Sequence, residues 1–141
     1  MHDIIPINLF PLRPLDADTL ATDPRCSAPG VFVIVAAGAE PRWAFVGKAD
    51  VSIAESIRAL GQGRGPLAAL VREGGAFVPV VMRNPEWREA AAAHLRREFA
   101  PLHNAPDVPE SKQPCVIQFH GSAAGRPAYL PGAGGGQGRA A

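Results

Sequence analysis

The chain has 141 residues, with 14 Lys and Arg side chains against 13 Asp and Glu, so its formal net charge is +1. This length suits one domain with its own core, because domains typically contain roughly 100–200 residues. The small net charge argues against a strongly basic nucleic-acid coat and against an acidic tail protein, but it allows a local basic patch.

The amino-terminal residues lack the basic start and the apolar stretch that a signal peptide needs. The longest apolar run, from Val31 to Ala37, falls far short of the ~20 residues that cross a bilayer. We therefore expect a cytoplasmic protein with no membrane partner.

Residues 1–28 are predicted to form a Pro-rich amino-terminal arm. The prolines between residues 6 and 29 prevent any long helix in this segment. One helical turn is expected over residues 15–20, with Asp16 as its N-cap.

The pattern sharpens after residue 28, where a central domain over residues 29–104 is predicted. Val31 to Val35 is rich in β-branched residues, which predicts a buried strand, and Trp43 to Val46 predicts a second strand in a hairpin with it. Residues 77–82 predict a third strand. Pro79 places that strand at a sheet edge or interrupts it, because proline has no N–H to donate to the ladder.

Three helices are predicted between and after these strands. Ser52 and Glu55 form a capping-box pattern at the start of the first helix. A short helix follows over residues 66–73. The longest helix covers roughly residues 86–99, with Asn84 as its N-cap.

Residues 105–120 are predicted to form a carboxy-terminal extension with a possible extra strand over Cys115 to His120. Residues 121–141 are rich in glycine, which predicts a disordered tail, and a turn is predicted over residues 36–42. The expected fold class is α+β: a small three-stranded mixed or antiparallel sheet with flanking helices and flexible termini.

Two glycine-bearing triplets lie on the two hairpin strands: Gly30-Val31-Phe32, and then Phe45-Val46-Gly47 followed by Lys48. A Pro-x-x-Asn ending, Pro101 to Asn104, follows the long helix. In this order the triplets, helices and ending resemble the GIY-YIG nuclease superfamily, over about residues 29–104. The resemblance implies a GIY-YIG-like domain related to nucleases.

The chemistry of that family needs two tyrosines, an arginine and a glutamate that holds a divalent metal. At the tyrosine positions this chain has Phe32 and Phe45, and at the glutamate position it has Ala92. The arginine position falls on Glu55, or on Ser56 if the match slips by one residue. A benzyl ring has no hydroxyl group, so it can stack but cannot transfer a proton. The resemblance therefore implies a degenerate domain with no catalytic residue, no metal site and no cofactor.

The leading hypothesis is a catalytically inactive module that is retained for binding nucleic acid or a partner. Phe32, Phe45, Lys48, Arg58 and Asn104 are the residues expected to line the former cleft. Because few Lys and Arg residues cluster there, we expect any nucleic-acid binding to be weak and sensitive to salt.

Two alternatives stay open. One is a protein-interaction or assembly subunit without a nucleic-acid role, in which the amino-terminal arm and the apolar segment 115–119 add an edge strand to a neighbour. The other is a metal-dependent endonuclease with a rearranged site. In that case Arg58 and Glu89 replace the lost groups, and Glu89 holds Mg²⁺ or Mn²⁺.

Overall fold

The computed structural model describes residues 4–36, 42–105 and 113–121. These residues form an α+β fold, as the sequence predicts. The elements in chain order are β1 (Ile5–Leu9), β2 (Arg13–Pro14), α1 (Ala17–Thr22), the 3₁₀ helix η1 (Pro24–Ser27), β3 (Gly30–Ala36), β4 (Arg42–Ala49), α2 (Ile53–Gly61), α3 (Pro66–Glu73), β5 (Ala76–Val81), α4 (Pro85–Phe99) and β6 (Cys115–Phe119). Most of the predicted turn at 36–42, and the predicted tail from residue 122 onward, lie outside the described residues.

The central sheet has four strands in the order β2-β5-β3-β4, not the three predicted from the sequence. All its pairings are antiparallel: Phe32 on β3 lies opposite Gly47 on β4 and opposite Pro79 on β5. The additional strand, β2, pairs Arg13 with Phe77. The prediction of three strands was wrong because β2 is two residues long and includes a proline, so it carries no strand pattern of its own.

Among the described residues, Pro79 lies where β5 pairs with a strand on one side only. β2 pairs with Ala76 and Phe77 and extends no further along β5, whereas β3 pairs with β5 along its whole length. On that side of Pro79 no strand of the described residues accepts a ladder hydrogen bond, so a residue without an N–H is tolerated there. The prediction that Pro79 places the strand at an edge or interrupts it is wrong for the strand as a whole, because β5 is continuous and lies between β2 and β3.

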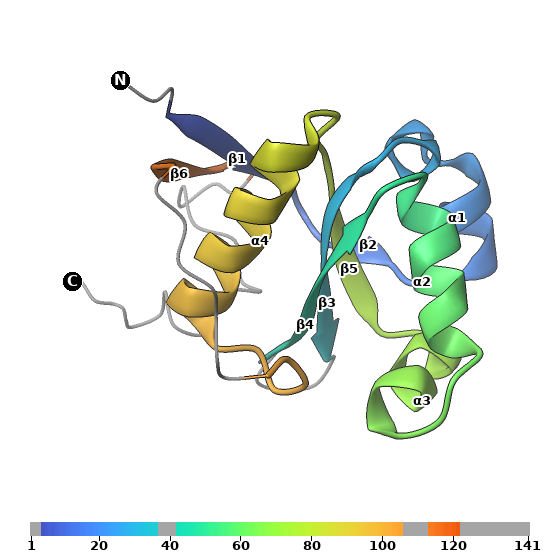
Figure 1. Ribbon diagram of the computed structural model, residues 1–141. Helices are drawn as coiled ribbons and strands as arrows, with labels where there is room; N and C mark the ends of the chain where they lie inside the picture. Colours follow the sequence, from blue (N-terminus) through green and yellow to red (C-terminus); the bar gives the residue numbers. More distant parts are fainter. Residues whose placement is uncertain (1–3, 37–41, 106–112, 122–141) are drawn as a thin grey trace.

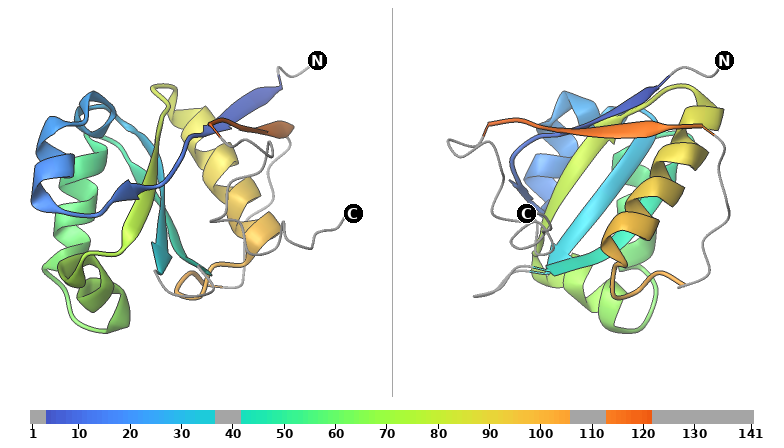
Figure 2. Two further views of the ribbon diagram at one scale, coloured as in Figure 1. Left: turned by 180° about the vertical axis from the view of Figure 1, so that it is seen from behind. Right: turned by 90° about the vertical axis from the view of Figure 1, so that its left-hand side faces the viewer.

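A second sheet joins the two ends of the described chain (Figure 2). Its strands β1 and β6 are parallel, with Ile5 opposite Cys115 and Leu9 opposite Phe119. Ile5, Ile7 and Leu9 are completely buried, so the amino-terminal segment contributes a strand to the core. The extra strand predicted at Cys115 is confirmed. The assembly hypothesis assigns the amino-terminal arm and segment 115–119 to the sheet of a neighbouring chain. In the structure, strands from these two segments pair with each other.

Helices cover both faces of the four-stranded sheet (Figure 1). We call the side packed against α4 the α4 face and the side packed against α1, α2 and α3 the α2 face. Because strand side chains alternate between faces, Val31 and Val33 enter the apolar cluster on the α4 face, and Phe32 and Ile34 enter the cluster on the α2 face. The sheet thus separates two apolar clusters.

The helices begin at the residues that the sequence predicts. The Asp16 carboxylate accepts a hydrogen bond from the Thr19 N–H at 2.8 Å, and the Asn84 side-chain oxygen accepts one from the Glu86 N–H at 2.9 Å. The Ser52 hydroxyl oxygen accepts one from the Glu55 N–H at 3.1 Å. Each of these bonds satisfies a donor that the first turn leaves without a helical partner. None of the helices in the described residues is long and apolar enough to cross a membrane.

Candidate binding surface

The two glycines of the hairpin triplets lie where the structure leaves no room for a side chain. A Cβ atom on Gly30 would stand 2.0 Å from the carbonyl oxygen of Val80. A Cβ atom on Gly47 would stand 2.4 Å from the Cζ atom of Phe32 and 2.8 Å from a ring carbon of Phe45. Gly30 therefore permits the close approach of β3 and β5, and Gly47 permits two aromatic rings to lie against β4.

Phe32 and Phe45 lie next to each other on the α2 face. Their ring centroids are 6.2 Å apart, and both rings approach Gly47. Phe32 is 1% exposed, so it is a core residue in this structure and offers almost no surface to the ligand that the sequence predicts for it. Phe45 is half-buried and keeps part of its ring accessible.

Lys48 extends from β4 toward α4 rather than toward the two phenylalanines. Its ammonium group forms an ion pair with the Glu89 carboxylate. The side chains of Lys48 and Glu89 are 40% and 70% exposed, so the pair lies at the surface of the α4 face. Glu89 neutralises much of the charge that Lys48 would offer to a phosphate.

The endonuclease hypothesis requires Arg58 and Glu89 to act on one substrate. Arg58 is an exposed residue of α2, and Glu89 is an exposed residue of α4. These two helices lie on opposite faces of the four-stranded sheet (Figure 1). The structure does not bring the two residues together.

The position matched to the metal-holding glutamate, Ala92, is part of the apolar core. Ala92 is 5% exposed and belongs to the apolar cluster between α4 and the sheet, so a carboxylate there would be buried among hydrocarbon side chains. Among the residues that the structure describes, no three His, Cys, Asp or Glu side chains lie close enough to hold one metal ion.

Asn104 bonds to the outer edge of β4. Its side-chain oxygen accepts a hydrogen bond from the Val46 N–H at 2.8 Å, and its side-chain nitrogen donates one to the Val46 carbonyl at 3.0 Å. The preceding residue, His103, donates its N–H to the Ala44 carbonyl at 2.8 Å. The carboxamide of Asn104 thus pairs with the edge of β4 as a neighbouring strand would. The sequence predicts that Asn104 binds a ligand, whereas here its side chain bonds to the backbone.

Arg88 is a polar residue of the interior that the sequence analysis missed. It is 6% exposed, and its guanidinium donates to the carbonyls of Met82 and Arg83 and to the Asp50 carboxylate, each at 3.1 Å. These bonds join the start of α4 to the segments that directly follow β4 and β5. The many charged residues in α4 predict an exposed side for the helix and give no signal that one arginine turns inward.

A pocket of 590 Å³ lies at the carboxy-terminal end of α4. Its walls come from the last turns of the helix and the segment that follows, namely Arg96, Arg97, Ala100, Pro101, Leu102, Asn104 and Ala105. Arg96 donates to the Ala105 carbonyl at 3.0 Å, and Leu102 is 52% exposed. None of these described lining residues is acidic. The adjacent Arg96 and Arg97 before the Pro-x-x-Asn ending are the sequence signal for this pocket, which we name the α4-end pocket.

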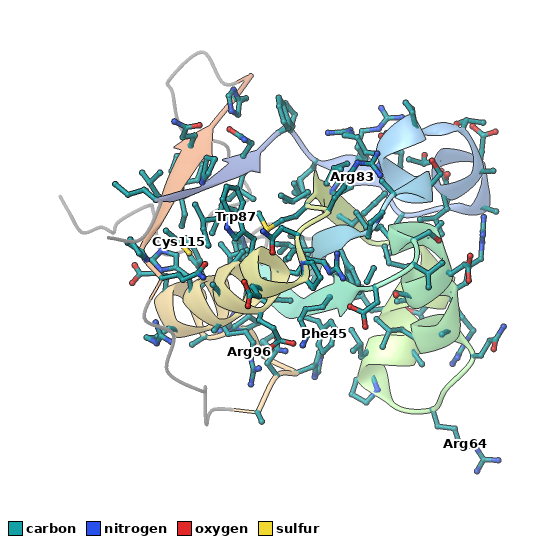
Figure 3. The ribbon with its side chains drawn as sticks, turned by 45° about the horizontal axis from the view of Figure 1, so that its top comes forward. Phe45, Arg64, Arg83, Trp87, Arg96 and Cys115 are labelled. Atoms are coloured by element: carbon teal, nitrogen blue, oxygen red, sulfur yellow. The ribbon has the colours of Figure 1, made fainter. Side chains whose placement is uncertain are left out.

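Two guanidinium groups beside an apolar wall suit the binding of an anionic ligand rather than acid–base chemistry, because arginine stays protonated at all physiological pH values. Arg96 lies at the carboxy-terminal half of α4 in Figure 3, and Arg64 lies at the tip of the α2–α3 loop, far from the helix.

In comparisons with known proteins, no family model matches the chain, and neither a curated protein nor a solved structure gives a match.

Proposed function

We propose that the chain is a catalytically inactive, GIY-YIG-like module that binds nucleic acid weakly. The observation that carries the proposal is that the positions where the resemblance expects reactive groups hold side chains that make structural contacts. Phe32 and Phe45 close over Gly47, and Asn104 bonds to the backbone of Val46. These side chains hold the hairpin together and offer no group that transfers a proton.

The arginines of the α4-end pocket favour nucleic acid as the partner. A guanidinium group matches the geometry of a phosphate with two parallel hydrogen bonds, and phosphate contacts supply most of the affinity that does not depend on sequence. The net charge of +1 and the pairing of Lys48 with Glu89 limit that affinity. We therefore expect dissociation constants in the range of about 10⁻⁴ to 10⁻⁶ M.

Fluorescence anisotropy of labelled oligonucleotides tests this proposal. Single-stranded DNA, single-stranded RNA and duplex DNA are titrated with the protein between ~50 and ~200 mM salt, and each bound phosphate adds about −0.7 to the log–log slope for a single strand. We expect a slope between about −1.4 and −2.1, which corresponds to two or three phosphates. The same affinity at every salt concentration, or no binding to any probe at low salt, would contradict the proposal.

A second candidate function is protein interaction through β6. This strand pairs with β1 along one edge, no other strand of the described residues pairs with it, and its Val116 is 43% exposed. An open edge can accept a strand from another chain, and a lysine on the edge blocks such pairing. Light scattering should then show a mass that rises with protein concentration and stays at the monomer value in Val116→Lys. A wild-type monomer at all concentrations argues against this candidate.

A further inference from the structure

The residues predicted to line one cleft do not form one surface. Phe32 is buried, Arg58 lies on α2, and the carboxamide of Asn104 bonds to Val46. Lys48 lies at the surface of the other face and is paired with Glu89. A nucleic-acid strand therefore needs a different contact site from the one that the resemblance indicates.

The α4-end pocket has the size and the lining for part of such a strand. Its 590 Å³ falls within the roughly 300–1,000 Å³ typical of small-molecule sites. Arg97 is exposed and lines it beside Arg96, and Pro101 and Leu102 supply an apolar wall. A phosphate can pair with a guanidinium group while the sugar or base packs against the exposed Leu102.

Arginines in the last turn of a helix also interact favourably with the helix dipole, which gives them a structural role. That role accounts for Arg96, which donates to the Ala105 carbonyl and closes the segment onto the helix. The structural role of the arginines does not explain why a pocket lies next to the helix end, or why the exposed Leu102 lines that pocket.

We infer that the α4-end pocket holds one nucleotide of a single strand, with its phosphate on Arg97 and its apolar part against Leu102. This inference rests on the proposed function and names its contact site. A base in a duplex is stacked and paired, so it must leave the helix before it can enter a pocket of this size. Single strands should therefore bind more tightly than duplexes.

The test compares two charge reversals with the same change in net charge. Arg97→Glu alters the pocket, and Arg64→Glu alters the α2–α3 loop, far from α4 (Figure 3). Binding of labelled single-stranded DNA is measured for both variants and for the wild type, with melting temperatures to show that each variant is folded. We expect Arg97→Glu to weaken binding about tenfold and to reduce the salt slope by about 0.7, and Arg64→Glu to change the affinity less than about twofold.

Two further measurements separate the pocket from a general charge effect. Leu102→Ala should weaken binding about threefold without changing the salt slope, because it removes apolar contact and no charge. Inorganic pyrophosphate should compete with the DNA for the wild type.

The outcomes that contradict the account are distinct. Equal weakening by Arg97→Glu and Arg64→Glu overturns the inference and leaves the proposed function standing. No binding by the folded wild type overturns the proposed function, and the inference with it. Tighter binding of the duplex than of the single strand overturns the assignment of one unstacked nucleotide to the pocket.

Discussion

The two faces of the four-stranded sheet use the residues of the resemblance in different ways. On the α2 face, Phe32 and Phe45 lie against Gly47 within an apolar cluster. On the α4 face, Lys48 pairs with Glu89 at the surface, and the α4-end pocket opens beside Arg96 and Arg97. The first arrangement stabilises the fold, and the second leaves charged groups in contact with solvent.

The residues that the resemblance singles out therefore lie on both faces of the sheet and form no single surface. The positions that would carry chemistry on the α2 face are hydrocarbon and largely buried, so substitutions there should change stability. Lys48, Glu89 and Arg97 on the α4 face are exposed, so substitutions of these residues should change binding and leave stability almost unaltered. The following substitutions test that contrast, in order of decreasing expected effect.

Gly30→Ala should destabilise the protein most, because both faces depend on the contact between β3 and β5. The added Cβ atom would stand 2.0 Å from a backbone oxygen, which cannot move without shifting β5. We expect a loss of about 3 kcal/mol, the upper end of the usual range for overpacking. Urea unfolding measures it against Gly63→Ala, where the nearest atom is 3.5 Å away. Equal stability of the two variants would show that the strands are not this close.

Phe32→Tyr and Phe45→Tyr restore the hydroxyl groups that the resemblance expects. The hydroxyl on residue 32 would be buried beside Gly47 without an assigned partner, which costs about 2 kcal/mol. Residue 45 is half-buried, so its hydroxyl can reach water, and we expect a change below about 0.5 kcal/mol. Unfolding free energies for the matched pair check this asymmetry. If Phe45→Tyr is the more destabilised variant, the burial described for the α2 face is incorrect.

Asn104→Ala removes both side-chain hydrogen bonds to Val46 at the edge of β4. Each bond contributes about 0.5–1.5 kcal/mol, and we expect a total loss of about 1.5 kcal/mol because the residue is only half-buried. Hydrogen exchange should show faster exchange of the Val46 amide than of the Val33 amide on the inner strand β3. An unchanged Val46 exchange rate would argue against a structural role for Asn104.

Lys48→Met removes the ion pair with Glu89, and here we expect the smallest effect. Exposed pairs contribute about 0–1 kcal/mol, so the free energy of unfolding should fall by less than about 0.5 kcal/mol. Thermal unfolding at low and high salt measures this change, with Glu89→Gln as the matched variant. A loss as large as that of Phe32→Tyr would erase the contrast between the two faces.

Much of the central domain could be predicted because its signals are local. The β-branched run at Val31–Val35 predicts β3, and the side chains of Asp16, Ser52 and Asn84 predict the helix starts that are observed. Strand β1 carries a signal that the prolines concealed: Ile5, Ile7 and Leu9 alternate with a period of two.

The contacts that decide the candidate site are not local. Asn104 meets Val46 across 58 positions of the chain, and Arg88 meets Asp50 across 38. Periodicity gives no information on such pairs. Strand alternation is enough to place Phe45 and Lys48 on opposite faces of the sheet, because they lie three positions apart on β4 and the register shift between Ile34 and Val35 lies beyond them. Arg58 and Asn104 lie outside the strands, so alternation gives no information about where they lie.

The most direct test of the central claim, binding without cleavage, is a single gel. Supercoiled plasmid is incubated with the wild-type protein at low salt in the presence of Mg²⁺ or Mn²⁺, and samples are run with and without prior digestion of the protein. We predict slower migration of the plasmid in the undigested sample and intact supercoiled DNA in the digested one. Metal-dependent nicking by the wild type that disappears in Glu89→Ala would contradict the account.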